Sequence, residues 1–423
     1  MKAIVVIGAG PAGMMAAITA AAQGAEVWIV EKKERVGKKL SITGKGRCNL
    51  TSSVEAAELV KGYPGNGRFL YSALHEFSNQ DLIEFFTQRG LKTKVERGNR
   101  VFPESDQAEE VVQVMYDNML QAGVKLVKAN PVQGIIIENA HVKGVDCQQG
   151  KIPAQAVIIC TGGMSYPGTG STGDGYHWAS AAGHSIVEPR PGLVPLLVRE
   201  EWVQDLQGLS LKNTRATAYS AEGKKINQDF GELLFTHFGL SGPIILSMSH
   251  DIGEYLYKTK KQVSIELDLK PALSEEKLDE RLQRDLDKYS RKKFKNALDE
   301  LLPQKIIPVI IRLSGIEPEK VCHQINRSER LTLVQLLKHL HMIIYGTRPI
   351  AEAIVTAGGV NVKEIDPRTM QSKLVKGLFF AGEVLDIDGY TGGYNLQAAF
   401  STGYLAGLHA ALSEFNAGSE LTG

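Results

Sequence analysis

The strongest constraint on the fold lies near the N-terminus, where an apolar run leads directly into a glycine-rich loop. Residues 3–7 (AIVVI) are continuously apolar and of strand length, as expected for a parallel strand buried on both faces. The loop at residues 8–13 (GAGPAG) follows, and small helix-forming residues continue to Gln23. A second apolar run at residues 26–30 ends at Glu31. This order predicts a strand–helix–strand unit of the dinucleotide-binding type.

Each residue of this pattern has a physical role in such a unit. Gly8 allows the tight turn, Gly10 lets the backbone approach a pyrophosphate, and Gly13 lets the helix pack on the strand. The helix N-terminus stabilises the diphosphate charge. Glu31, 18 residues after Gly13, is placed to bind ribose hydroxyls, and an acid there fits a ribose without a 2′-phosphate. The pattern predicts a dinucleotide site without saying which dinucleotide it holds.

Further segments favour FAD over NAD. Residues 36–49 (VGKKLSITGKGRCN) form a basic, glycine-rich stretch where NAD domains usually continue into another helix. Residues 156–163 (AVIICTGG) and 377–383 (GLFFAGE) are apolar strands that end in glycine, the second with an acid. Residues 389–397 (GYTGGYNLQ) open an Ala/Gly-rich helix whose first-turn amides would stabilise negative charge at the N1/O2 edge of a reduced flavin.

Together these motifs resemble the two-dinucleotide-binding-domain flavoproteins, and more narrowly the BaiN/RdsA family of bacterial FAD-dependent oxidoreductases. The narrower resemblance spans residues 1–410 and is carried by GKKLSITGKGRCNLT, YPGTGSTGDGYHWASAAGH, THFGLSGP, VTAGGV and AGEVLDIDGYTGGYNLQAAFSTG. It implies an α/β fold with a glutathione-reductase-like FAD-binding Rossmann domain that holds FAD non-covalently.

The resemblance also implies which residues bind the cofactor. Val132, on a strand expected around residues 124–132, would offer a backbone contact to adenine. Thr161, Gly162, Gly382 and Glu383 would flank the ribityl chain and the diphosphate. The full expected set is Gly8, Gly10, Pro11, Ala12, Gly13, Glu31, Lys32, Lys39, Gly46, Arg47, Val132, Thr161, Gly162, Gly382, Glu383, Gly393, Asn395, Leu396 and Gln397.

A second match to the glycine pattern, at residues 168–173 (GTGSTG), lacks the apolar strand that would give it meaning. We interpret it as a loop ordered near the flavin. Since no second dinucleotide domain is visible, we expect NADH or NADPH, as the electron donor, to bind transiently over the flavin.

The chain of 423 residues is long enough for several domains. We predict a discontinuous FAD-binding domain at residues 1–190 and 345–423, because a proline-punctuated crossing begins at Pro189. Short β-like runs predict an inserted β-sheet or barrel domain at residues 191–271. Leucines at helical spacing predict a small helical subdomain at residues 272–344, nested in the insertion.

The helical insertion carries a local excess of cations, although the whole chain has a formal net charge of only +1. Eight Lys and Arg residues lie between Arg281 and Lys305, opposed by Asp285, Asp287, Asp299 and Glu300. Two interpretations remain open: a surface that positions the phosphates of ribosomal RNA, or a solvated helix face.

Two residues are candidates for proton transfer. Cys48 lies in the segment expected near the flavin beside Arg47, and a neighbouring cation lowers a thiol pKa. His237 lies in the distinctive run THFGLSGP of the insertion and would protonate a substrate that receives hydride. For each, a purely structural role is the alternative. A metal site is not expected, because no His, Asp or Glu cluster has ligand spacing.

Four cysteines without CxxC spacing indicate a reducing, cytoplasmic setting, and no apolar run is long enough to predict a membrane span. The leading functional hypothesis is NAD(P)H-dependent reduction of an activated C=C bond in a uridine of 23S ribosomal RNA, which gives dihydrouridine. The alternatives are a small-molecule enone as substrate and a non-catalytic flavin-binding redox sensor.

Overall fold

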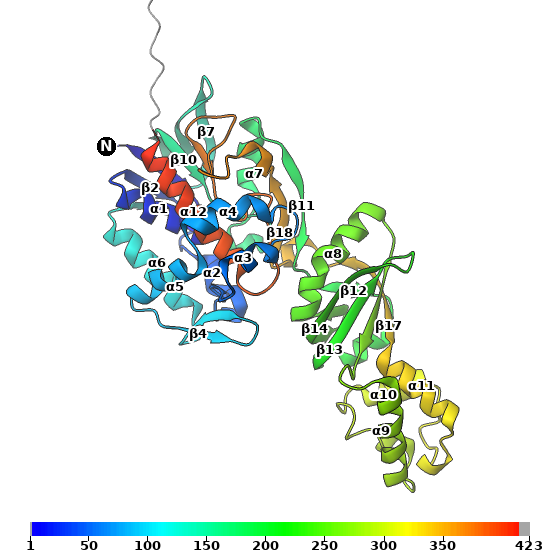
Figure 1. Cartoon of the computed structure of the whole chain (residues 1–423). Coiled ribbons are helices and arrows are strands. Elements are labelled where there is room, and N and C mark those ends of the chain that lie inside the picture. The colour runs from blue at the N-terminus through cyan, green and yellow to red at the C-terminus, as the bar shows by residue number, and fades with distance from the viewer. Residues whose placement is uncertain (1, 414–423) are drawn as a thin grey trace, which may run out of the picture. The chain divides into compact units, whose positions relative to one another are not determined.

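The computed structural model describes residues 2–413, which form two compact units (Figure 1). The sheet unit comprises Met1–Gly192 and Ile350–Gly423, and the barrel unit comprises Leu193–Pro349. Each unit has its own hydrophobic core.

The sheet unit is built on a five-stranded parallel sheet in the order β19-β10-β1-β2-β6. Its strands are β1 (Ala3–Ile7), β2 (Glu26–Val30), β6 (Lys125–Val127), β10 (Ala156–Ile159) and β19 (Leu378–Phe380). The central strands β1 and β10 are buried almost throughout, as their unbroken apolar sequences require. Because all five strands are parallel, their carboxyl ends meet at one edge.

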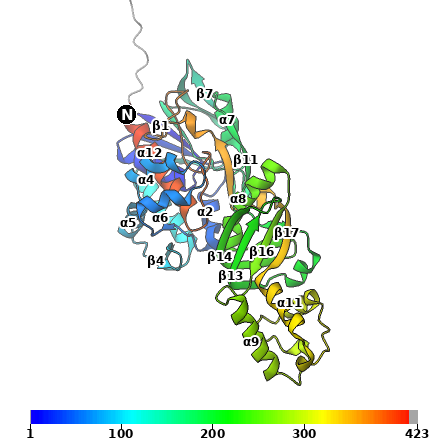
Figure 2. The ribbon, with the colours of Figure 1, turned by 45° about the vertical axis from the view of Figure 1, so that its right-hand side comes forward.

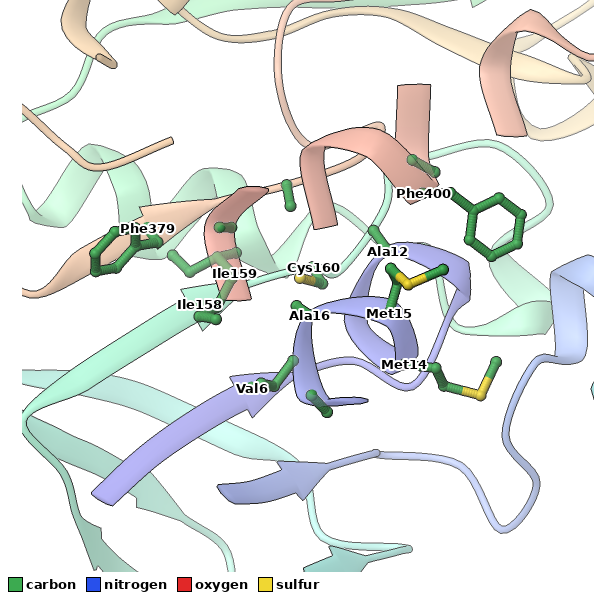
Figure 3. Close-up of a cluster of buried hydrophobic side chains, with 14 of the residues drawn as sticks. Val6, Ala12, Met14, Met15, Ala16, Ile158, Ile159, Cys160, Phe379 and Phe400 are labelled. Carbon is green, nitrogen blue, oxygen red and sulfur yellow. The ribbon is translucent and has the colours of Figure 1, made fainter. Parts of the chain in front are cut away.

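Two long helices, α1 (Pro11–Ala22) and α12 (Tyr394–Leu412), pack together over this sheet. Figure 3 shows Ala12 and Met15 of α1 on the side of Phe400 of α12, with Cys160, which follows β10, close to Ala12 and Ala16. Small residues at the contact let the two backbones approach closely. Residues of both helices belong to the core of the sheet unit.

Three smaller sheets complete this unit. Their orders are β3-β5-β4, β7-β8-β9 and β11-β18. Their strands are β3 (Thr51–Ser52), β4 (Thr93–Glu96), β5 (Arg100–Pro103), β7 (Val132–Glu138), β8 (His141–Cys147), β9 (Gly150–Pro153), β11 (Ile186–Gly192) and β18 (Val355–Val360). The remaining α-helices of the unit are α2 (Lys38–Ile42), α3 (Ala56–Leu59), α4 (Tyr71–Glu76), α5 (Asn79–Gln88), α6 (Ala108–Gln121) and α7 (Asp174–Ala181).

The barrel unit is a closed six-stranded barrel with helices attached (Figure 2). Its strand order is β12-β15-β14-β13-β16-β17. The strands are β12 (Leu196–Val198), β13 (Ser210–Tyr219), β14 (Lys225–Thr236), β15 (Gly239–Ser241), β16 (Val263–Asp268) and β17 (Leu340–Thr347), and the helices are α8 (Pro243–Thr259), α9 (Glu275–Lys288), α10 (Ile307–Ser314) and α11 (Arg327–Lys338). Alternate residues of β16 face the core, and α9, α10 and α11 gather at one end of the barrel.

The structure corrects three sequence-based boundaries. The limit predicted at 344 falls inside β17, whose alternating residues Leu340, Met342 and Ile344 are buried in the barrel. The limit predicted at 190 falls inside β11, which pairs with β18 in the sheet unit. The leucines of α9–α11 join the core of the barrel, so the helical residues do not form a separate compact unit.

Among the described helices, none combines the length and the apolar character that crossing a bilayer requires.

Candidate cofactor and active site

The carboxyl edge of the five-stranded sheet collects most of the residues that the sequence singled out. The glycine loop follows β1, Glu31 follows β2, Thr161 follows β10 and Glu383 follows β19 by three residues. In open parallel sheets, ligands bind outside the carboxyl ends of the strands. The topology therefore brings segments from residues 8 to 383 to one candidate site.

The glycine loop has two enclosed positions and one open one. A Cβ on Gly8 would lie 2.6 Å from the carbonyl oxygen of Cys160, and a Cβ on Gly13 would lie 1.9 Å from the carbonyl oxygen of Gly8. A Cβ on Gly10 would meet no atom within 4 Å. Gly10 also begins α1 without a side-chain cap, and Pro11 occupies its first turn. The loop thus presents open backbone, with free helix N–H groups, where a diphosphate would bind.

Glu31 is oriented by this loop. Its two carboxylate oxygens accept hydrogen bonds from the backbone N–H of Ala9 and of Lys33, each at 2.9 Å. Each oxygen keeps a further lone pair for a ribose hydroxyl. Lys32 points elsewhere, because its ammonium lies 2.6 Å from the Asp174 carboxylate.

Val132 does not lie on the strand predicted for residues 124–132. That strand, β6, ends at Val127, and Val132 begins β7 in a different sheet. The break follows from Ala129, which has a left-handed φ of +52°, and from Pro131, which cannot donate to a ladder. Val132 stays near the edge of the sheet, because the N–H of Asn130 donates to the carbonyl of Glu31 at 3.2 Å.

Glu383 is the centre of a polar network. The Lys39 ammonium lies 2.7 Å from one of its oxygens, and the other accepts from the backbone N–H of Thr356 at 2.7 Å and from the Ser165 hydroxyl at 3.1 Å. Lys39 also donates to Ser165 at 2.6 Å. The network joins α2, β18 and the segments that follow β10 and β19. Ser165 and Thr356 were not predicted from the sequence, although Thr356 lies in the quoted motif VTAGGV.

Thr161 and Gly162 shape the edge through their backbone. The Thr161 hydroxyl is buried and has no hydrogen-bond partner within residues 2–413. Gly162 has a φ of +69°, and a Cβ there would lie 3.0 Å from the Ser171 hydroxyl. Residues 168–173, which hold the second glycine pattern, form a loop that contacts Lys32, Lys33 and Lys38.

The start of α12 lies beyond Gly382 and Glu383. Gly393 precedes the helix with a φ of +97° and gives it no side-chain cap, so the first-turn N–H groups of Tyr394, Asn395 and Leu396 have no intrahelical acceptor. The prediction for Gln397 is wrong: its N–H donates to Gly393, and its buried amide bonds Thr51, Ser401 and the Phe77 carbonyl. The Gln397 side chain instead anchors the start of α12 to Thr51 and to the Phe77 carbonyl.

The two helices point the same way and are staggered. Gly403 of α12 packs on Ala12, and Gly407 packs on Ala16, so the helices run parallel. Ala12 is one residue into α1, whereas Gly403 is nine residues into α12. At about 1.5 Å per residue, the N-terminus of α12 lies roughly 12 Å beyond that of α1 along the axis. Both positive helix ends therefore face the same direction at two depths.

The basic segment after β2 is partly helical, which corrects its interpretation as a loop. Residues Lys38–Ile42 form α2, and left-handed residues follow, among them Gly46 with a φ of +83°. The Arg47 guanidinium pairs with Glu96 and Asp106 and lies 4.2 Å from the centre of the Phe102 ring. The partners of the Arg47 guanidinium are therefore two carboxylates and an aromatic ring of the protein itself.

The prediction for Cys48 is wrong in its physical basis. The side chain is fully buried, and burial raises the pKa of its thiol far above the usual range. Arg47 does not offset this effect, because its guanidinium turns to the two carboxylates. A buried thiol of this kind has no surface on which to meet a substrate.

His237 belongs to the barrel unit. It is exposed at the turn between β14 and β15, and its ring packs edge-to-face against that of Phe238 with centroids 4.9 Å apart. The Arg348 guanidinium lies 4.7 Å from the centre of the Phe238 ring.

The cations between Arg281 and Lys305 are less available than their number suggests. Four of them pair with carboxylates: Arg281 with Asp285, Lys288 with Glu300, and both Lys293 and Lys295 with Glu319. The two lysines lower the pKa of Glu319 to about 2. Within residues 2–413, Arg284, Arg291 and Lys292 are exposed and have no carboxylate partner.

An open parallel sheet whose carboxyl edge carries a glycine loop, a ribose acid and two staggered helix N-termini defines a class, the dinucleotide-dependent oxidoreductases. The relatives described below are a reductase and a dihydrouridine synthase, and the chain is an enzyme of the oxidoreductase class. It belongs to the family described as the HI0933-like protein Rossmann domain, whose model matches residues 2–409.

Several known proteins are similar over nearly their whole length. A 3-dehydro-bile acid delta(4,6)-reductase of Clostridium scindens is 33% identical over 415 residues, which cover 97% of this chain and 99% of that protein. A ribosomal RNA dihydrouridine synthase of Haemophilus influenzae is 32% identical over 410 residues, which cover 96% and 97%. A solved 3-ketosteroid delta1-dehydrogenase from Sterolibacterium denitrificans shares the fold at a TM-score of 0.54 and 12% identity, covering 98% of this chain and 100% of that one.

Proposed function

We propose that this chain binds FAD non-covalently along the carboxyl edge of the sheet and uses NADH or NADPH to reduce an activated C=C bond. The parallel, staggered pair α1 and α12 carries the proposal. It offers one positive helix end for a diphosphate and a second, roughly 12 Å further on, for the ring system.

The residues fit this cofactor. The space beside Gly10 admits a diphosphate, and Glu31 retains lone pairs for ribose hydroxyls. The Lys39–Glu383 pair offers a polar, half-buried flank. The free amides of Tyr394, Asn395 and Leu396 would stabilise negative charge in the ring that they face. When bound, FAD supplies hydride-transfer chemistry that no amino-acid side chain provides.

Reduction of a C=C bond also requires a proton at the second carbon. With Cys48 buried, we propose exposed His237 as the proton donor. The expected result is that His237→Ala slows reoxidation of the reduced flavoprotein by substrate at least tenfold, with FAD still bound. Cys48→Ala serves as the control and leaves that rate unchanged. Equal reoxidation rates in His237→Ala, Cys48→Ala and the wild type would exclude His237 as the proton donor.

For the substrate, we propose a uridine of 23S ribosomal RNA, reduced to dihydrouridine. Support comes from the similarity to the ribosomal RNA dihydrouridine synthase of Haemophilus influenzae and from the exposed Arg284, Arg291 and Lys292. The test is mass-spectrometric quantification of dihydrouridine in ribosomal RNA from a strain lacking the gene. Loss of the base, restored by complementation, is expected; an unchanged level would contradict the proposal.

The role of the three unpaired cations is tested separately. Charge reversal at Arg284, Arg291 and Lys292 is expected to weaken RNA binding and to reduce the slope of log K against log salt by about 2 to 3. Lys295→Glu is the control for a cation already paired with Glu319. Equal slopes for the wild type and the triple variant would exclude this surface.

A small-molecule enone is the second candidate substrate. The 33% identity to the bile-acid reductase favours this substrate as directly as the 32% identity to the dihydrouridine synthase favours RNA. Reoxidation of the reduced protein by a steroid enone but not by ribosomal RNA would establish this alternative.

A further inference from the structure

A short segment of the sheet unit, residues 62–66 (GYPGN), holds the glycine-rich turn that leads into α12. The Gly62 carbonyl accepts from the backbone N–H of Tyr390 at 2.9 Å, and the Tyr63 hydroxyl donates to the Tyr394 carbonyl at 2.7 Å. The Asn66 amide donates to the carbonyl of Asp386 at 2.9 Å and to its carboxylate at 2.8 Å. Four hydrogen bonds therefore connect the segment to residues 386–394.

The segment also fits the turn in shape. The rings of Tyr63 and Tyr394 pack edge-to-face with centroids 5.7 Å apart. A Cβ on Gly62 would lie 2.2 Å from the Tyr394 ring, and one on Gly389 would lie 2.8 Å from the Cβ of Tyr394. Only glycine at both positions allows this arrangement, and Tyr63 is buried beneath it.

The turn needs such support, because its own sequence does not define one conformation. Gly392 and Gly393 have φ values of +125° and +97°, and glycine loses the most conformational freedom when it is ordered. Within the turn, Asn395 bridges back to Gly389 through two bonds of 2.8 Å. The segment 62–66 adds contacts from far away in the sequence: one reaches Tyr390 in the turn, and the others reach Asp386 before it and Tyr394 after it.

We propose that Tyr63 and Asn66 are positioning residues for the cofactor ring. They order the glycine turn and aim the free amides of Tyr394, Asn395 and Leu396 before any ligand arrives. The inference rests on the proposed binding of FAD at the start of α12. Ordering a site in advance strengthens binding, because the ligand no longer bears that entropic cost.

The discriminating variant is Tyr63→Phe, which keeps the ring and removes the single hydrogen bond to Tyr394. Loss of one such bond corresponds to about fivefold in an equilibrium constant. We expect faster hydrogen exchange in the apoprotein at the bonded N–H groups of Gly389 and Tyr390, and a roughly fivefold larger FAD dissociation constant. We also expect a lower midpoint potential, since misaimed amides stabilise the reduced, more negative ring less than the oxidised one.

Tyr404→Phe is the matched control. Tyr404 lies on the same helix and stacks on Phe77, and its hydroxyl has no hydrogen-bond partner within residues 2–413. It should match the wild type in exchange, affinity and potential. Asn66→Ala should reproduce the effects of Tyr63→Phe through the other two bonds.

The outcomes separate this inference from the proposed function. Failure of the wild-type protein to bind FAD would contradict the proposed function itself. Wild-type FAD binding, together with unchanged exchange and potential in both Tyr63→Phe and Asn66→Ala, would overturn the positioning role alone. A loss of thermal stability with no change in potential would assign the segment a structural role and would also overturn it.

Discussion

Gly403 of α12 lies directly on Ala12 of α1, so that a Cβ at Gly403 would stand 2.3 Å from the Ala12 carbonyl oxygen. One turn later, Gly407 stands in the same relation to Ala16. This contact fixes the parallel alignment and the stagger of the two helices. The position of the N-terminus of α12 therefore depends on Gly403 and Gly407, which place no side chain between the two helices.

Gly403→Ala should destabilise the protein, because the added methyl group meets backbone atoms that cannot move aside. We expect a loss of about 1 to 3 kcal/mol, measured by thermal or denaturant unfolding. Gly253→Ala in α8 is the control, since a Cβ there would meet only a Thr347 methyl group at 3.9 Å. That variant should be neutral or more stable by about 0.5 to 1 kcal/mol. Equal effects at the two sites would contradict the helix contact.

The cysteines should be unreactive in the folded protein. All four are buried, and burial raises the pKa of Cys48 and of Cys160. We expect DTNB to react slowly with the native protein and to detect all four thiols only after unfolding. One rapidly reacting thiol in the native protein, traced to Cys48, would restore it as a catalytic candidate.

His184 should make the sheet unit sensitive to acid. Burial lowers the pKa of this imidazole, and this effect outweighs the opposing effect of the Glu364 carboxylate 3.1 Å away. Because the folded state favours the neutral ring, its contribution is present above about pH 6.5 and is lost as the pH falls below that value. His184→Gln should therefore show a smaller drop in Tm between pH 7.5 and 5 than the wild type. An equal drop would contradict this assignment.

His339 in the barrel unit should behave in the opposite way. Glu266 is the main cause of a raised pKa for this histidine, and Glu275 adds to it. The folded state then favours the protonated ring, so its contribution is present below about pH 6.5 and is lost as the pH rises above that value. In an NMR titration, the His339 ring should remain protonated to a higher pH than the His184 ring. The reverse order would contradict both assignments.

The sequence predicts local units well because they depend on neighbouring residues. The apolar run, glycine loop and acid at residues 3–31 all form the predicted strand–helix–strand unit, and the β-like insertion predicted at residues 191–271 contains the barrel strands β12 to β16. The sequence does not predict which residues, distant along the chain, the topology brings into contact. Lys39 and Glu383 are 344 residues apart, and the carboxylates that neutralise Arg47 belong to β4 and to the residue segment after β5.

The same limit explains the errors at Cys48 and Gln397. A cation next to a cysteine in sequence says nothing about where its guanidinium points, and here it points away into an ion-pair cluster. Gln397 shares a motif with residues at the helix start, but it lies one position too far into α12 to have a free N–H. Tyr63 and Asn66 belong to none of the sequence motifs, and their hydrogen bonds to Tyr394 and Asp386 are seen only in the folded structure.

The central claim, that FAD lies along the carboxyl edge with its diphosphate at Gly10, is tested most directly by FAD titration of Gly10→Ala. A Cβ at Gly10 meets no protein atom within 4 Å, so the fold should tolerate it and only a ligand should be displaced. Gly134→Ala in β7, also without neighbours within 4 Å, is the matched control. The account predicts wild-type stability in both variants, with FAD affinity at least tenfold weaker in Gly10→Ala alone. Unchanged FAD affinity in a stably folded Gly10→Ala protein would contradict it.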